Sequence, residues 1–424
     1  MNKKLGIGGL TTIIKIAYRN IFRNMRRSIL CIVAIFFAVF FILVMMGWVS
    51  GMLNSFKHII TTFESGHITL LTEEYEKKKE FYPLQYPLIP PNDNLNDLVN
   101  EIKKIDNVQY VLPRITSYAT LMDNFVKHAV LWGVDIETEG KANNLNLKDR
   151  NNGLKEGRMP KNGDNECLVG YKLARKMNIK IGDKIPMKII SCQYSDKYFM
   201  PEVVGLFDFD YNAYDGNVII VPFDRLQRVA TMKNKTQSIF IFLNDKEKSD
   251  EAIKNIENLV KGTDIKVLNW KQNFWLAYME QMKIIYYFVY MVFIVVASFL
   301  IINTIIMVIH ERIKEIGMMG ALGLTRFEIM LVFFFEALIL SIFGSFLGAT
   351  IGGLANLIFS FFPISFDALT GGSMDMPITS TLYVSFSFTN VIQGFVFGVL
   401  VSGVCTIIPS LKSVFIEPVE ALRR

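Results

Sequence analysis

Four long stretches without a charged residue, one alone and three close together, constrain this 424-residue chain most strongly. They are residues 28–56, 284–309, 337–366 and 376–411. A helix of about 20 apolar residues crosses a bilayer, and a helix satisfies its own backbone hydrogen bonds in lipid. We therefore expect four membrane-spanning helices, with a polar insert of 227 residues between the first and the second.

The distribution of basic residues predicts the orientation of the spans. Residues 1–27 carry seven Lys or Arg residues and no acidic residue. Basic residues beside a first span stay in the cytoplasm. Four spans then return the C-terminus to the cytoplasm and leave the insert and the loop 363–390 outside. The insert has 32 basic and 31 acidic residues, but large domains are translocated largely regardless of charge.

Residues 10–27 have the spacing of an amphipathic helix. Basic and apolar residues form two parallel rows with a spacing of four: Lys15, Arg19, Arg23 and Arg27, and Ile13, Ala17, Ile21 and Met25. This pattern is typical of a helix at an interface with anionic lipid. The alternative is a simple basic flank of the first span.

The insert has mixed helix and strand patterns. Helical patterns at 95–105 and 249–260 are followed by strand patterns at 108–112 and 265–269. These two units lie near opposite ends of the insert. We expect them in one membrane-proximal α+β subdomain, with a strand-rich distal subdomain between them. Cys167 and Cys192 either pair or remain two separate thiols.

The loop between the second and third spans, 310–329, predicts a short helix held between two membrane helices. Residues 311–322 are good helix formers, and Gly323 is placed to end a helix in the left-handed conformation. Thr325 and Glu328 form a capping box that begins the next helix. Such an element suits a mechanical lever better than a catalyst.

The chain lacks the common catalytic and nucleotide-binding motifs. Lys314 stands where a zinc-protease motif beginning at His310 needs histidine, and neither G-x-x-x-x-G-K-[ST] nor G-x-S-x-G occurs. We expect a transport subunit without enzymatic activity, without a cofactor or metal of its own, and without a nucleic-acid partner.

Small residues recur every fourth position in the third and fourth spans. The rows are Gly344, Gly348 and Gly352; Ala337, Ser341, Ser345, Ala349 and Gly353; and Gly394, Gly398 and Ser402. Such rows let another helix approach closely, either within the chain or in a second subunit. Glu336, an acid well inside an apolar segment, is expected to pair with a basic residue.

Three motifs resemble ABC transporter permeases of the FtsX-like and MacB-like superfamily: A-Y-R-N-I-F-R-N at 17–24, E-R-I-K-E-I-G-M-M-G-A-L-G at 311–323 and E-P-V-E-A-L-R at 417–423. Within the insert, 65–70, 132–135 and 153–184 look like the lipoprotein-releasing (LolC/LolE) branch. The resemblance implies an α-helical membrane protein of the bacterial inner membrane with four transmembrane helices (1 + 3). A large α+β periplasmic domain is inserted between helices 1 and 2.

The resemblance also implies a function, partners and site residues. ATP hydrolysis on a separate cytoplasmic ABC ATPase dimer, which binds ATP and Mg²⁺, would drive extrusion of lipoproteins from the outer leaflet. The other implied partners are a second permease, a periplasmic carrier and membrane lipids. The coupling residues are Glu311, Lys314, Glu315, Gly317, Ala321, Leu322 and Gly323, and the lipid-chain candidates are Phe37, Phe41, Met45, Met46, Ile294 and Ile301. The alternatives are an ATPase-gated regulator of a periplasmic hydrolase and a free-standing efflux permease of the macrolide-exporter type.

These expectations divide the chain into nine segments. They are a cytoplasmic amphipathic helix (1–27), the first span (28–56), the periplasmic domain (57–283, with a proximal part 57–124 plus 236–283 and a distal part 125–235), the second span (284–309), the coupling helix (310–328), the third span (329–362), a periplasmic loop (363–390), the fourth span (391–411) and a cytoplasmic tail (412–424).

Overall fold

The structure is a computed structural model. It describes residues 7–23, 25–122, 126–142, 153–311, 313–321, 324–362, 364–365, 381–382 and 384–414. The chain forms two compact units. The membrane unit comprises Met1–Ser55, Glu280–Ile364 and Leu382–Arg424, and the inserted domain comprises Phe56–Met279 and Ser365–Thr381.

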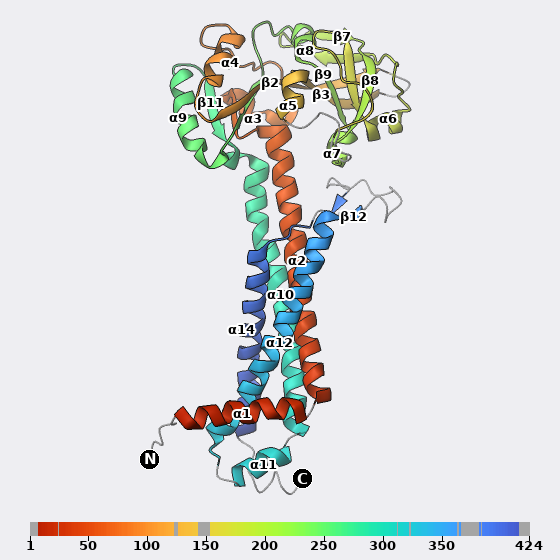
Figure 1. Cartoon of the computed structure of the whole chain (residues 1–424). Coiled ribbons are helices and arrows are strands. Elements are labelled where there is room, and N and C mark those ends of the chain that lie inside the picture. The colour runs from red at the N-terminus through yellow and green to blue at the C-terminus, as the bar shows by residue number, and fades with distance from the viewer. Residues whose placement is uncertain are drawn as a thin grey trace. The chain divides into compact units, whose positions relative to one another are not determined.

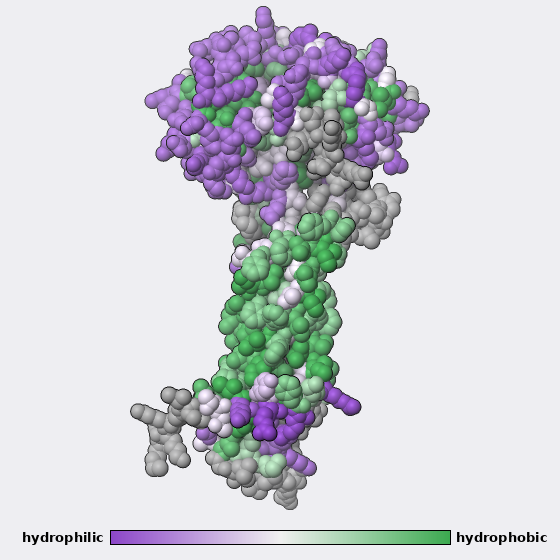
Figure 2. All heavy atoms as spheres, in the orientation of Figure 1, coloured by the Kyte–Doolittle hydropathy of each residue, from purple (hydrophilic) through white to green (hydrophobic). Residues whose placement is uncertain are grey.

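Four helices among the described residues are long and apolar enough to cross a membrane. They are α2 (Met25–Ile60), α10 (Phe274–Glu311), α12 (Arg326–Phe361) and α14 (Phe388–Val414). Two shorter helices, α1 (Ile7–Arg23) and α11 (Ile313–Ala321), lie at one end of the spans, and α1 runs across them (Figure 1). Hydrophobic side chains cover the outside of the spans (Figure 2). The predicted one-plus-three arrangement is confirmed.

Helix α2 packs closely against α12 and α14 along one stripe. It buries Cys31, Ile35, Val39 and Leu43, which are each four residues apart. Glycines of the partner helices face this stripe. A Cβ atom at Gly344 would lie 2.9 Å from the Cβ of Ile35, and one at Gly394 would lie 2.8 Å from the Cγ of Leu43. The helices approach this closely only because these positions lack side chains.

Two hydrogen bonds reinforce this packing where α2 passes Leu43 and Gly47. The Asn356 side-chain amide on α12 donates to the carbonyl of Leu43 at 2.8 Å. The backbone N–H of Ser385, just before α14, donates to the carbonyl of Gly47 at 2.9 Å. A Cβ atom at Gly47 would lie 2.4 Å from the Asn356 amide nitrogen. Helices α2, α12 and α14 therefore form one tightly packed group.

Helix α10 packs differently. Of its side chains that the structure describes between Ile284 and Met307, none is buried. Many apolar side chains on it are more than half exposed, including Phe288 and Phe299. In a bilayer, lipid would cover these side chains. Among the described side chains, those of α10 are therefore covered less by the rest of the chain than those of the other three spans.

The inserted domain is built on one mixed sheet, which has eleven strands within the described residues. The main path runs β11-β1-β10-β2-β3-β9-β5-β8-β4, and β6 pairs with β2 and carries β7. Strand β2 (Val108–Met122) joins two parts of the sheet, because its first half pairs with β10 and its second half with β3. The other strands are β1 (Ile68–Thr72), β3 (Val126–Val134), β4 (Gly153–Gly157), β5 (Glu166–Gly170), β6 (Met187–Ile190), β7 (Asp196–Phe199), β8 (Glu202–Asp208), β9 (Val218–Pro222), β10 (Ser238–Leu243) and β11 (Ile265–Asn269).

Seven short helices accompany this sheet: α3 (Glu73–Lys77), α4 (Leu95–Lys103), α5 (Ile136–Ala142), α6 (Tyr171–Met177), α7 (Asn212–Asp215), α8 (Phe223–Val229) and α9 (Ser249–Leu259). A separate two-stranded sheet pairs β12 (Ile364–Ser365) with β13 (Thr381–Leu382). The predicted helix–strand units are confirmed as α4–β2 and α9–β11. One sheet and one apolar core run through both predicted subdomains, whose boundaries stay a prediction. Cys167 and Cys192 are free thiols.

Helix α2 enters the inserted domain through a π-helical turn, Thr61–Ser65. A buried arginine holds this turn. Arg114 on β2 is 1% exposed, donates to the carbonyl of Phe63 and pairs with Glu139 on α5. Its guanidinium lies between the rings of Trp132 and Phe240, 5.1 and 4.8 Å from their centres. The end of α2 is thus fixed by buried charge and by aromatic packing.

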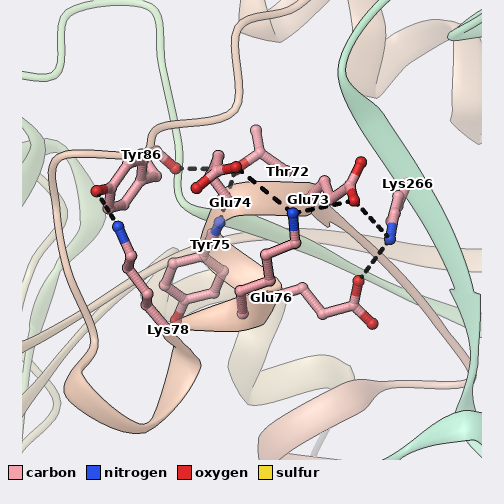
Figure 3. A network of polar contacts seen from close by, with 9 residues as sticks. Thr72, Glu73, Glu74, Tyr75, Glu76, Lys78, Tyr86 and Lys266 are labelled. Atoms are coloured by element: carbon pink, nitrogen blue, oxygen red, sulfur yellow. Dashed lines mark hydrogen bonds and ion pairs between the residues drawn. The ribbon is translucent and has the colours of Figure 1, made fainter.

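A second polar network lies at helix α3 (Figure 3). The Thr72 hydroxyl caps this helix by accepting from the backbone N–H of Tyr75 at 3.3 Å. Lys266 on β11 lies 3.0 Å from the carboxylate of Glu76 and 3.8 Å from that of Glu73. These charges are exposed, so each pair contributes little to stability. The network positions α3 against the edge strand β11.

Candidate functional site: an apolar hollow and a coupling helix

An apolar hollow of about 550 Å³ lies in the membrane unit between α2, α10 and α14. Its volume falls within the range of roughly 300–1,000 Å³ that is common for ligand sites. All three helices form its walls. The lining residues are Ile42 and Met46 from α2; Tyr287, Tyr290, Met291 and Ile294 from α10; and Ile392, Gln393, Gly394, Val396, Phe397 and Leu400 from α14.

The hollow exists because α10 does not close onto the other spans. Leu43 of α2 fills the space beside Gly394, which brings α2 and α14 together. A separate small pocket of about 20 Å³ lies nearby and shares Ile42, Ile294 and Phe397 as lining residues.

The few polar groups of the hollow come from tyrosine and glutamine side chains. The rings of Tyr287 and Tyr290 meet edge to face, with their centres 6.5 Å apart. Gln393 adds an amide from α14. An apolar volume with a few groups able to form hydrogen bonds suits the chains of an amphiphile. Among the lining residues of the hollow, no side chain is an acid, lysine, arginine, histidine, serine or cysteine.

The structure places the six predicted lipid-chain residues in different surroundings. Met46 and Ile294 line the hollow. Phe37 and Phe41 are 48% and 55% exposed and stack on each other at 6.1 Å, away from it. Met45 is half-buried, and the side chain of Ile301 lies outside what the structure describes. Contact of any of them with substrate stays a prediction.

Sequence analysis missed the contribution of α14 to the hollow. The small-residue row that contains Gly394 predicted close packing. It did not predict that Ile392 and Phe397 beside it would face an open volume. Tyr287 and Tyr290, near the start of the second span, gave no sign of an open volume either. These residues become a site only when three helices meet.

The coupling helix α11 is packed against the start of α12. Ile316 of α11 is buried with Ile329 and Phe333 of α12. On another face, the carboxylate of Glu315 lies 2.7 Å from the guanidinium of Arg23 on α1. Helix α11 therefore contacts two elements besides the span that precedes it. Three residues of the predicted apolar row, Ile13, Ala17 and Ile21, are buried in the membrane unit. The fourth, Met25, was predicted wrongly, because α1 ends at Arg23 and Met25 is an exposed residue at the start of α2.

The other predicted coupling residues occupy both faces and both ends of this segment. Lys314 is exposed and Gly317 is buried. Glu311 ends α10 and Ala321 ends α11, whereas Leu322 and Gly323 lie outside the described residues. The predicted capping box is confirmed. The Thr325 hydroxyl accepts from the N–H of Glu328 at 3.3 Å, and the Glu328 carboxylate accepts from the N–H of Thr325 at 2.8 Å.

The small-residue rows face other helices of the same chain. Gly344, Gly348 and Gly352 lie against α2, and Gly353 lies against Val391 of α14. Gly398 meets both Val39 of α2 and Ser345 of α12. Glu336 is only 5% exposed. Its pairing with a basic residue stays a prediction.

Comparison with known proteins identifies the family. The MacB-like periplasmic core domain matches residues 28–259, more than half of the chain. The FtsX-like permease C-terminal domain matches residues 287–418. The chain is an ABC transporter permease of the FtsX-like and MacB-like family. The FtsX-like match contains α11 and most of α10, and the MacB-like match contains α2 and most of the inserted domain.

Three relatives show the range of the family. The permease is 26% identical to an uncharacterised ABC transporter permease of Methanocaldococcus jannaschii over 80% of this chain and 82% of the relative. It is 24% identical to the lipoprotein-releasing system transmembrane protein LolC of Xylella fastidiosa, over 73% and 76%. It is 24% identical to the macrolide export ATP-binding/permease protein MacB of Neisseria gonorrhoeae, over 52% and 33%. The solved periplasmic region of MacB from Actinobacillus actinomycetemcomitans is 14% identical over 50% of this chain and 92% of that chain, with a TM-score of 0.34.

Proposed function

We propose that this permease is the membrane subunit of a transporter that extrudes lipoproteins from the outer leaflet of the inner membrane. Its termini lie in the cytoplasm and the inserted domain lies in the periplasm. A separate ABC ATPase, which holds ATP and Mg²⁺, supplies the energy. A second permease, identical or related, completes the membrane part, and a periplasmic carrier receives the lipoprotein.

The hollow between α2, α10 and α14 is the observation that carries this proposal. Its walls are almost entirely apolar, and its volume of about 550 Å³ accommodates a flexible chain. One of its walls is α10, the span with no buried side chain among those described from Ile284 to Met307. A site with one loosely held wall can open toward the bilayer. The lipoprotein-releasing LolC relatives support lipid chains as its occupant.

The coupling helix provides a route for the ATPase to act on the hollow. Helix α11 follows α10 along the chain and packs on α12 through Ile316. When α11 is displaced, α10 yields before the tightly packed group α2, α12 and α14. The hollow then changes volume, and its chain is expelled. In this proposal, Lys314 and the end of α11 face the ATPase, because Glu315 and Ile316 are engaged within the chain.

Photo-crosslinking tests the proposal. A crosslinking residue at Met46, in the hollow, should capture a lipid-modified protein in cells that contain the cognate ATPase. The matched control is the same residue at Phe41, on the same helix but away from the hollow. Equal capture at both positions would contradict the assignment of the hollow.

The same experiment separates the alternatives. Capture of a small hydrophobic compound at Met46, without lipoprotein, would favour the efflux permease. Capture of a soluble hydrolase by crosslinkers in the inserted domain, with nothing at Met46, would favour the regulator. Lipoprotein that accumulates at Met46 when the ATPase is catalytically inactive, and is lost when the ATPase is active, supports extrusion.

A further inference from the structure

Helix α1 presents three different faces. Ile13, Ala17 and Ile21 form a buried face, and the helix packs against α12. The second face is apolar but exposed, and comprises Leu10, Ile14, Tyr18 and Phe22. The third face carries Lys15, Arg19 and Arg23, each exposed and four residues apart. With 3.6 residues per turn, the cationic face lies about a third of a turn from the exposed apolar face.

The exposed apolar face is suited to the boundary of a bilayer. Tyr18 and Phe22 are both exposed, and their rings meet edge to face at 5.0 Å. Aromatic side chains favour the level of the lipid headgroups. Helix α1 runs across the end of the hydrophobic spans (Figure 1). The cationic face therefore lies where headgroup phosphates are found.

One residue of the cationic row already pairs with an acidic side chain of the same chain. Arg23, at its end, pairs with the carboxylate of Glu315 on the coupling helix at 2.7 Å. The two side chains are 59% and 35% exposed, so another anion can reach the pair. Among the described residues, α1 itself contributes no acidic side chain. Glu315 is thus the counter-ion that the row receives from another helix.

We propose that the row Lys15, Arg19 and Arg23 is a binding site for anionic phospholipid headgroups, and that the lipid and Glu315 compete for Arg23. A headgroup bound at Lys15 and Arg19 also reaches Arg23 and releases the coupling helix from α1. The lipid composition of the leaflet beside α1 then sets how freely α11 moves. The regulatory part rests on the proposed function of α11, whereas lipid binding does not.

Lipid retention by the full-length chain tests the site. The protein is incorporated in nanodiscs of phosphatidylcholine with phosphatidylglycerol and then extracted, and the retained lipids are measured by mass spectrometry. The double variant Lys15→Gln/Arg19→Gln should retain about tenfold less phosphatidylglycerol, because each basic residue near the surface adds to the attraction. The control Lys103→Gln/Lys104→Gln, which removes two exposed charges from the inserted domain, should retain as much as the wild type.

Competition is tested with Glu315→Gln. Removing the competing carboxylate should raise phosphatidylglycerol retention about twofold, because binding of the lipid and of Glu315 are reciprocally linked. Unchanged retention in this variant overturns the competition, and unchanged retention in the Lys15/Arg19 variant overturns the site. Displacement of the lipid by inorganic phosphate alone overturns the assignment to phospholipid. None of these measurements involves lipoprotein release. Their outcome is therefore independent of whether the proposed function is correct.

Discussion

Helices α2 and α10 both lead into the inserted domain, yet they are held in opposite ways. In the membrane unit, α2 packs closely against glycines of α12 and α14, and its carbonyls at Leu43 and Gly47 accept hydrogen bonds. No described side chain of α10 from Ile284 to Met307 is buried, and this helix borders an open hollow. Similar apolar composition therefore supports a fixed helix and a loosely held one.

The difference shows that apolar length decides whether a helix spans a membrane, while small residues decide how tightly it packs. Lipid satisfies an apolar side chain as well as protein does, so burial alone does not drive helices together. Close approach needs glycine or serine on one side, as at Gly348 and Ser345. The glycine contacts described above join α2, α12 and α14, and none of them involves a described side chain of α10.

The largest effect on stability is expected where the end of α2 is fixed in the inserted domain. Arg114→Met removes the basic half of the buried pair with Glu139 and should lower the free energy of unfolding by about 3–5 kcal/mol. Chemical denaturation followed by tryptophan fluorescence measures this change. Arg158→Met, which breaks an exposed pair with Glu166, is the matched control and should cost little stability, because solvent screens this pair.

If the two arginine variants lose the same stability, the end of α2 is not specially fixed. The double variant Arg114→Met/Glu139→Leu provides a second check. It removes both buried charges and should recover most of the loss, because the cost comes from breaking a buried ion pair on one side only.

The next largest effect on stability concerns the close packing of α2 in the membrane unit. Gly348→Ala places a Cβ atom 2.8 Å from the carbonyl oxygen of Phe36 and should destabilise the protein by about 1–3 kcal/mol. Gly403→Ala in α14 is the control, since its Cβ meets nothing within 4 Å. The control should be neutral or stabilising, because alanine favours a helix over glycine by about 1 kcal/mol. Thermal unfolding in detergent distinguishes the two.

A smaller effect on stability is expected for a substitution in α10. Ile294→Trp enlarges a side chain that lines the hollow and should change stability by less than about 1 kcal/mol, because the space is open. The same variant should reduce crosslinking from Met46 severalfold. Val295→Trp, at an exposed neighbouring position, is the control and should leave crosslinking unchanged. A loss of stability as large as that of Gly348→Ala would remove the contrast between α2 and α10.

The smallest effect is a pH dependence near the end of α2. Burial, and then the charge of Lys246, lower the pKa of His67 below 6.5. The neutral Nδ1 accepts the N–H of Leu243 at 2.9 Å. The unfolded chain binds a proton more readily, so stability falls as the pH drops through and below about 6.5. Denaturation of His67→Gln should show a weaker decline than the wild type, while the exposed control His128→Gln should keep it.

Sequence reasoning succeeded where a local pattern fixes a structure. The Thr325–Glu328 capping box needs only residues three apart, and the four-residue spacing of the glycines needs only one helix. It could not choose which face of α2 binds substrate. That helix is apolar all round, so Phe37, Phe41 and Met46 are equivalent in sequence. The hollow and the Arg23–Glu315 pair arise from helices far apart in the chain, which no local pattern encodes.

The contact between Gly47 and Asn356 restricts how this chain can change over time. Any side chain at position 47 would collide with the Asn356 amide, which then could not reach the carbonyl of Leu43. Replacing Asn356 first with a smaller residue removes the bond but makes room at position 47. Mutations at these positions are thus tolerated in one order and rejected in the other. Lineages that lose the asparagine are the ones in which position 47 becomes free to vary.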